Sequence, residues 1–308
     1  MTQPPRSPGS LPPEGAASGF GRPGTAGNES VLRFACEGEP LVGILAEPEG
    51  MPAEVGVLII VGGPQYRAGS HRQFTLLARH LAANGFVALR FDYRSMGDSP
   101  GETRDFLAVD ADIAAAIDAL LAARPALKRV VLWGLCDAAS AALLYLDSTR
   151  DARVAGVALL NPWVRSAATL AQTHVKHYYW RRLRQPEFWL KLLKGGIGGT
   201  ALRTLASNLR LARGAGRKAS DSRSFQDRMA AGLRGFDGPA LLILSGDDYT
   251  AREFGLHVEA SPAWAGLLGT PRLQREALVQ ADHTFSDPHQ AATVEAITLS
   301  WLDKIRVR

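Results

Sequence analysis

The sequence contains few cysteines and no long apolar run. Cys36 and Cys136 are the only cysteines in 308 residues, too few for a disulfide framework or for a cluster of Cys and His ligands around a metal ion. No run of about 18 apolar residues occurs, and the N-terminal region lacks the apolar core of a signal peptide. We therefore expect no cofactor, no metal ion and no transmembrane helix, in a protein of the reducing cytoplasm.

The composition is that of a large folded domain with one unstructured end. Hydrophobic residues make up 46% of the chain and charged residues 21%, which excludes global disorder. The length fits one large α/β domain with an insertion, or two small domains. Residues 1–30 are rich in Pro, Gly, Ser and Ala and cannot bury enough surface to offset the entropy lost on ordering. The sequence therefore predicts a disordered tail over 1–30.

Strand and helix patterns alternate along the remainder of the chain. The first two strands are interpreted as an antiparallel hairpin, and later strands are apolar throughout, as expected of parallel strands buried on both faces. This order predicts an α/β fold with a mostly parallel sheet of about eight strands, helices on both faces, and ligands at the carboxyl ends of the strands. The predicted strands are 31–36, 41–47, 55–61, 86–91, 130–134, 154–160, 240–244 and 272–279, and the predicted helices are 74–83, 105–123, 137–145, a segment starting near 251, and 288–305.

A cysteine lies where one of these strands turns into a helix. Gly134, Cys136 and Ala138 form the pattern G-x-C-x-A. Small residues two positions before and after the central residue allow the sharp strand-to-helix bend of a nucleophile elbow, which exposes the side chain at the turn. The helix N-terminus favours a thiolate there and stabilises an oxyanion. A buried cysteine is more often a small hydrophobe, so the assignment of Cys136 as nucleophile depends on the rest of the chain.

Two later strand ends supply the other groups of a catalytic triad. Asp247 and Asp248 follow the strand 240–244, and His283 follows the last strand. The order nucleophile, acid, histidine is the one found in α/β-hydrolases, where the imidazole accepts the proton of the nucleophile and a carboxylate orients the imidazole. We assign Cys136, Asp248 and His283 as the triad. Asp248 is preferred as the acid because the frame Gly-x-Asp-x-Thr places it nearer the following helix. Asp247 stays the competing acid.

An oxyanion hole requires two backbone N–H groups beside the nucleophile. We assign the N–H of Asp137 as one of them, since it directly follows Cys136. The second is expected from Gly63 or Gln65, because Pro64 between them has no N–H. Glycines after a buried strand allow the backbone to approach a ligand closely, although they are equally compatible with a simple turn.

Three further residues are assigned to substrate binding. Tyr66 and Arg67 continue the glycine-containing loop after the strand 55–61, and Trp163 follows the strand 154–160. Ligands of open α/β sheets bind outside the carboxyl ends of the strands. We therefore expect these side chains to border a small-molecule or acyl substrate.

Positive charge is concentrated in one segment. Between Arg165 and Arg234 there are 15 Lys/Arg and 3 Asp/Glu, in a chain whose net charge is +5. We predict a basic helical cap over 163–238, inserted between core segments 31–162 and 239–308. A solvated basic face, attraction to an anionic inner membrane and binding of an anionic substrate stay open as interpretations. Nucleic acid is not expected as a partner, because no recognition motif accompanies the charge.

Four motifs resemble those of a known family. They span 62–74, 91–99, 133–140 and 281–286. From about Val31 to its end the chain resembles α/β-hydrolases with a cysteine nucleophile, and its triad is similar to that of dienelactone hydrolases. In the four motifs it resembles more closely the exosortase A system-associated hydrolase 1 family. The resemblance implies an α/β-hydrolase fold and a hydrolase of unassigned substrate, linked to the exosortase and exopolysaccharide systems of Gram-negative bacteria.

The sequence departs from the usual pattern at three positions. Cys136 and Ala138 occupy positions where the nucleophile elbow usually has Ser and Gly. Ser95 occupies a position of the loop in the motif 91–99 where Gly is usual. A thioester forms readily on a cysteine, but its hydrolysis requires a well-placed water molecule. Two hypotheses follow. The protein is an enzyme that attacks an ester, thioester or lactone carbonyl, as a hydrolase or an acyltransferase, or it is a non-catalytic accessory protein that docks through its cap.

Overall fold

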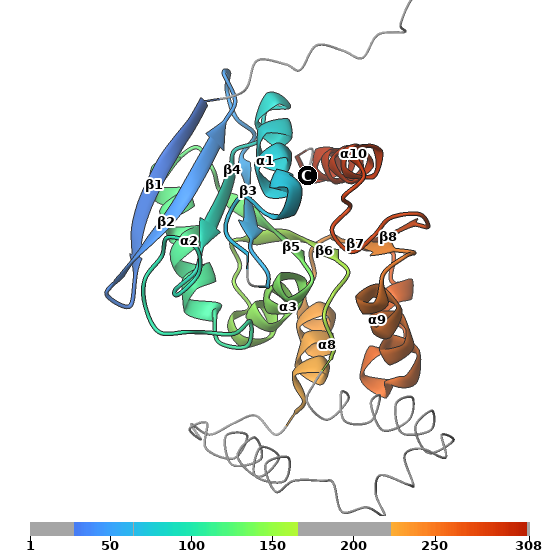
Figure 1. Ribbon diagram of the computed structural model, residues 1–308. Helices are drawn as coiled ribbons and strands as arrows, with labels where there is room; N and C mark the ends of the chain where they lie inside the picture. The colour runs from blue at the N-terminus through green and yellow to red at the C-terminus, as the bar shows by residue number, and fades with distance from the viewer. Residues whose placement is uncertain (1–27, 64, 166–222, 307–308) are drawn as a thin grey trace, which may run out of the picture.

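The computed structural model describes residues 28–63, 65–165 and 223–306. These residues form a single sheet with helices on both of its faces (Figure 1). Within the described ranges, no helix combines the length and apolar character needed to cross a membrane. The predicted tail up to residue 27 and the cap residues 166–222 lie outside the described part, so the disorder of the tail and the helical cap stay predictions.

The sheet has eight strands in the order β1-β2-β4-β3-β5-β6-β7-β8. The first two form an antiparallel hairpin, β2 pairs antiparallel with β4, and all other pairings are parallel. The predicted fold class is therefore confirmed. The strands are β1 Asn28–Cys36, β2 Glu39–Glu47, β3 Val55–Ile60, β4 Ala88–Asp92, β5 Arg129–Leu135, β6 Val154–Leu160, β7 Ala240–Ser245 and β8 Leu273–Leu278.

The helices divide between the two faces of the sheet. Figure 1 shows α1 and α10 on one side, and α2, α3, α8 and α9 on the other. Because both faces are covered, the central strands β3 and β6 are buried at every residue. The helices are α1 Gln73–Ala83, α2 Asp110–Ala123, α3 Asp137–Thr149, α8 Phe225–Gly235, α9 Tyr249–Ala260 and α10 Pro288–Arg306, with short 3₁₀ turns at Ser70–Arg72, Pro262–Trp264 and Leu267–Gly269.

The strand register brings distant strand ends together. Ile60 of β3 pairs with Gly134 of β5, and Leu135 of β5 pairs with Leu160 of β6. Leu160 in turn pairs with Ile243 of β7. The loops that leave these four strands therefore meet at one edge of the sheet, where parallel strands place their ligand sites.

Two boundaries differ from those expected from the sequence. Strand β1 begins at Asn28 rather than Val31, so its first residues lie in the segment assigned to the tail. Helix α8, which falls within the range assigned to the cap, packs against α3, and Gly232 lies so close that an added Cβ would be 2.1 Å from the carbonyl oxygen of Leu143. The described end of that insertion is therefore part of the core layer.

The loop after β4 is anchored by buried charges. Arg94 donates from Nε and Nη2 to the Asp112 carboxylate of α2 at 2.9 and 2.8 Å, and its backbone N–H donates to the same carboxylate at 3.0 Å. The carboxylate of Asp92 accepts backbone N–H groups from Arg67 at 2.7 Å and Asp98 at 3.1 Å. Asp92 and Arg94 thus hold the loop in place, which is a structural role rather than a chemical one.

Candidate active site

Cys136 lies at a strained turn between β5 and α3. Its φ of 63° and ψ of −126° place a non-glycine residue in a sparsely populated region, at a cost of about 1–3 kcal/mol. Hydrogen bonds hold the turn: the Cys136 N–H donates to the Leu160 carbonyl at 2.8 Å, and the Cys136 carbonyl accepts the N–H of Trp163 at 3.2 Å. This is the backbone geometry that the elbow pattern predicts.

The small residues around Cys136 are required by close packing. An added Cβ at Gly134 would lie 2.6 Å from the carbonyl carbon of Ala138 and 2.7 Å from the backbone nitrogen of Ala139. Ala138 itself is 1% exposed. The first turn of α3 therefore folds back directly over the end of β5, and only glycine fits at 134.

His283 is paired with a buried carboxylate. Its Nδ1 lies 2.9 Å from Oδ2 of Asp248. Asp248 caps α9 by accepting the backbone N–H groups of Thr250 and Ala251 at 3.1 and 3.0 Å, so its carboxylate is held in a fixed orientation. Asp247, the competing acid, is exposed. The structure thus places Asp248, and not Asp247, against the imidazole.

Charge interactions favour a protonated imidazole at this site. Hydrogen bonds with Asp248 and Cys136 raise the pKa of His283 to about 10, and burial opposes this shift. Burial works against ionisation of Asp248 as well, but the bonds from His283, Ala251 and Thr250 bring its pKa below the usual value. At neutral pH the site therefore holds an imidazolium between the carboxylate of Asp248 and the sulfur of Cys136.

The raised pKa of His283 predicts a pH-dependent contribution to stability. An ordinary histidine has a pKa of 6.5 and His283 one of about 10, so the folded state binds the proton more tightly. The stabilisation is complete below pH 6.5 and disappears as the pH rises through 10. We expect the difference in unfolding free energy between wild type and His283→Ala, measured by urea denaturation, to shrink across this window. A difference that grows with pH would contradict the assignment.

A polar network missed by the sequence analysis positions the His283 loop. Asn161 is fully buried, and its Nδ2 donates to Oγ of Ser245 at 2.8 Å and to the His283 carbonyl at 3.2 Å. The Ser245 N–H donates to Asn161 Oδ1 at 2.8 Å, and the Ser245 hydroxyl donates to the Asp282 carbonyl at 2.8 Å. The ends of β6 and β7 are thereby tied to the loop. A polar residue after a buried strand was the only signal in the sequence.

The expected oxyanion-hole donors have acceptors in this structure. The Gly63 N–H donates to Oδ1 of Asp137 at 2.7 Å, and the Gln65 N–H donates to the Gly63 carbonyl at 2.8 Å. Burial raises the pKa of Asp137, and hydrogen bonding to backbone N–H groups, with that of Gly63 first, opposes the shift. A side chain thus accepts one of the N–H groups expected to bind a substrate oxygen.

Comparison with known proteins agrees with the observed fold. The sequence profile of the alpha/beta hydrolase family matches residues 57–296. The chain belongs to the alpha/beta hydrolase family. No curated protein matches it in sequence.

Solved structures with this fold include several named as hydrolases. This alpha/beta hydrolase is similar to an esterase from Pyrococcus furiosus, with 15% identity, a TM-score of 0.58, and 90% of this chain and 92% of that one covered. It is similar to a dienelactone hydrolase from Anabaena variabilis, with 15% identity, a TM-score of 0.55, and coverage of 91% and 99%. It is also similar to a putative alpha/beta hydrolase from Agrobacterium tumefaciens, with 16% identity, a TM-score of 0.55, and 89% of this chain and 95% of that one covered. At these identities the likeness concerns the fold alone.

The three residues assigned to substrate binding in this alpha/beta hydrolase differ in solvent exposure and in the contacts that their side chains already make. The side chain of Arg67 is engaged by Asp92 and, at 2.6 Å, by Asp98. Tyr66 is 52% exposed, and the Arg67 guanidinium lies over its ring, 5.7 Å from the centroid. Trp163 donates from Nε1 to the Arg165 carbonyl at 2.9 Å. Tyr66 is therefore the most accessible of the three, and their contact with substrate stays a prediction.

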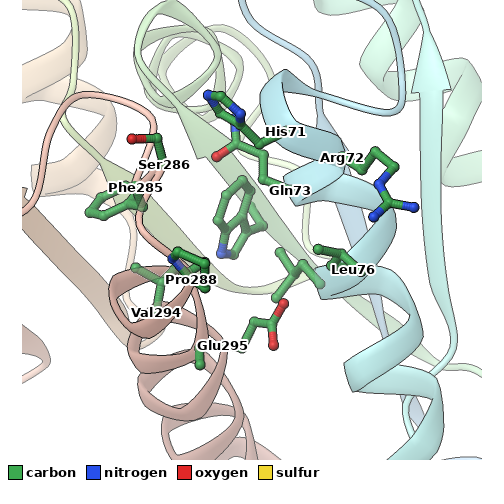
Figure 2. Close-up of a pocket in the computed structure, with 13 residues that line it drawn as sticks. His71, Arg72, Gln73, Leu76, Phe285, Ser286, Pro288, Val294 and Glu295 are labelled. Carbon is green, nitrogen blue, oxygen red and sulfur yellow. The ribbon is translucent and has the colours of Figure 1, made fainter. Parts of the chain in front are cut away.

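A cavity lies beside the candidate active site of this alpha/beta hydrolase. This cavity of about 380 Å³ lies between α1 and α10, and its lining includes Leu76, Trp133 and Phe285. Figure 2 shows Leu76 and Phe285 together with His71 and Arg72, which also line it. Its size is that of a small-molecule pocket. The triad residues do not line it, so it is a separate feature of the α1–α10 face that borders the loop carrying the imidazole.

Proposed function

We propose that this alpha/beta hydrolase cleaves an ester, thioester or lactone through a covalent thioester on Cys136. The supporting observation is the meeting of Cys136 and the His283–Asp248 pair at neighbouring strand ends. Asp248 Oδ2 lies 2.9 Å from Nδ1 of His283, and interaction with Asp248 and then with Cys136 raises the pKa of this imidazole. A nucleophile next to an oriented base is the recurring arrangement for acyl transfer.

In the first step, Sγ of Cys136 attacks the carbonyl carbon and its proton resides on His283. The carbonyl π electrons move to oxygen, and backbone N–H groups of Asp137 and Gly63 stabilise the charge that develops there. When the tetrahedral species collapses, the bond to the leaving group breaks and His283 returns the proton to that group. The products are a thioester on Cys136 and a free alcohol, thiol or, for a lactone, a tethered hydroxyl.

In the second step, water attacks the thioester carbonyl. His283 accepts a proton from that water, the C–S bond breaks, and the carboxylic acid is released while the sulfur regains its original state. An alcohol in place of water would make the same residues an acyltransferase. Asp248 keeps the imidazole oriented in both steps and stabilises its protonated form.

The biological setting is proposed from the four motifs that resemble exosortase-associated hydrolases. They support a link between the proposed activity and exopolysaccharide or exosortase systems. The basic cap, which lies mostly outside the described residues, is proposed to contact an anionic acyl substrate or the anionic surface of the inner membrane from the cytoplasmic side. The alternative is a non-catalytic accessory protein, and a docking role would not require the strained backbone conformation at Cys136.

Intact mass after incubation with p-nitrophenyl esters and acyl thioesters tests the proposal. Wild type is expected to gain one acyl group on Cys136, and Cys136→Ala none. The control is Cys36→Ala, which removes the other thiol, 3% exposed, and is expected to acylate like wild type. Absence of the adduct from wild type with every substrate, or equal labelling of Cys136→Ala, would contradict the proposed function and favour the accessory role.

A further inference from the structure

The side chain that follows the nucleophile points back into the site. Asp137 is the first residue of α3. Its carboxylate accepts the Gly63 N–H at 2.7 Å. The Gly63 N–H is one of the two donors that a substrate oxyanion requires.

We propose that the Asp137 carboxylate is a built-in occupant of the oxyanion hole, which must be displaced before an ester carbonyl can bind. The inference rests on the proposed function and adds regulation to it. In the described conformation Cys136 lies beside its base, but the Gly63 N–H that would stabilise the reaction intermediate is engaged by the Asp137 carboxylate.

The backbone is shaped to admit this carboxylate. At Gly62 an added Cβ would lie 2.3 Å from Oδ1 of Asp137, 2.6 Å from the Leu135 carbonyl oxygen and 2.9 Å from the Ala138 nitrogen. Any side chain at 62 would therefore expel the carboxylate or push the loop away from the elbow. The glycine pair at 62 and 63 thus serves the contact with Asp137, in addition to leaving room for a ligand.

The strength of the contact argues against easy displacement by a neutral carbonyl. A hydrogen bond to an ionised acceptor is roughly twice as strong as one between neutral groups, so an ester oxygen competes poorly for the Gly63 N–H. A developing oxyanion would also be repelled by a carboxylate in the same place, and this repulsion is strong in a poorly solvated site.

The charged surroundings hold the carboxylate in place. Burial raises the pKa of Asp137, while the backbone donors and the charge of the His283 imidazolium favour its ionised form. Burial is also the main cause of the raised pKa of Tyr93, and the negative charge of Asp137 adds to it. A cation therefore attracts the Asp137 carboxylate and the Gly63 N–H binds it, so the loss of the side chain would free that donor.

The test compares acylation of wild type, Asp137→Ala and Asp137→Asn by p-nitrophenyl acetate, measured as the initial burst of p-nitrophenol and by intact mass. Asp137→Ala is expected to acylate at least about tenfold faster than wild type, because a freed oxyanion donor is worth 10²–10³ in rate. Asp137→Asn, which keeps an oxygen acceptor without the charge, is expected to lie between them. Glu102→Gln removes an exposed carboxylate elsewhere and is expected to match wild type.

A second measurement distinguishes occupancy of the hole from a general change in the site. Sodium acetate, exchanged for sodium chloride at equal ionic strength, is expected to inhibit Asp137→Ala by refilling the hole and to leave wild type unchanged. Equal acylation of wild type and folded Asp137→Ala, with Cys136 labelled in both, would overturn the inference and leave the proposed function standing. Absence of labelling in every variant would overturn both.

Discussion

Replacement of His283 by alanine is expected to slow acylation of Cys136 at pH 7 by a factor of about 10² to 10⁴, the usual contribution of a positioned acid–base group. Two losses combine. The thiol of Cys136 loses the group that holds its proton, and the leaving group loses its proton donor. The initial burst of p-nitrophenol released from p-nitrophenyl acetate measures the acylation of Cys136 directly.

A matched control is available on the neighbouring helix. His289 of α10 is exposed, so His289→Ala removes one imidazole without touching the site and is expected to acylate at the wild-type rate. Added imidazole is expected to restore part of the activity of His283→Ala. If His283→Ala acylated as fast as wild type, the imidazole would have no part in the chemistry, and the pairing of His283 with Asp248 would serve only to anchor the loop.

The sequence predicts the elements of this site better than it predicts their contacts. The eight strands, the turn at Cys136 and the loop with His283 follow from periodicity, from small residues at fixed spacing and from strand ends, all of which are local signals. The α2 helix shows the limit: it begins at Asp110 rather than at the expected residue 105. Asp105 instead accepts the N–H of Leu107 through its side chain at 3.0 Å and that of Ala108 through its carbonyl at 3.0 Å, forming a turn.

The contacts depend on which strand ends become neighbours. The Asn161 network joins residues more than eighty positions apart, and the Asp137–Gly63 bond joins residues 74 positions apart. Neither follows a periodic pattern, because each exists only after β3, β5, β6 and β7 have paired in register. The sequence predicts that the backbone N–H of Asp137 belongs to the oxyanion hole. Only the folded chain shows that the side chain of Asp137 accepts the N–H of Gly63, the other expected donor.

The largest effect on stability is expected from Asp112, which lies far from the chemistry. The side chain of Asp112 is fully buried, and that of Arg94 is 3% exposed. Removing one member of a buried pair costs about 3–5 kcal/mol when the other charge is left uncompensated, and without Asp112 the guanidinium of Arg94 keeps Glu37, whose side chain is 62% exposed, as a partner. Asp112→Ala also leaves the backbone N–H of Arg94 without its acceptor, so we expect a loss within that range.

Urea denaturation monitored by circular dichroism measures this loss as a lower midpoint with an unchanged slope. The control is Glu54→Ala, because the ion pair of Glu54 with Lys128 has side chains 66% and 67% exposed, and an exposed pair contributes at most about 1 kcal/mol. The double variant with Arg94→Leu and Asp112→Leu is expected to lose less than the two single changes combined, since no charge is left buried alone. A loss of less than about 1 kcal/mol for Asp112→Ala would mean that Glu37 or water compensates the charge of Arg94 in solution. In that case the loop between β4 and α2 would be held by the contacts of Asp92 instead.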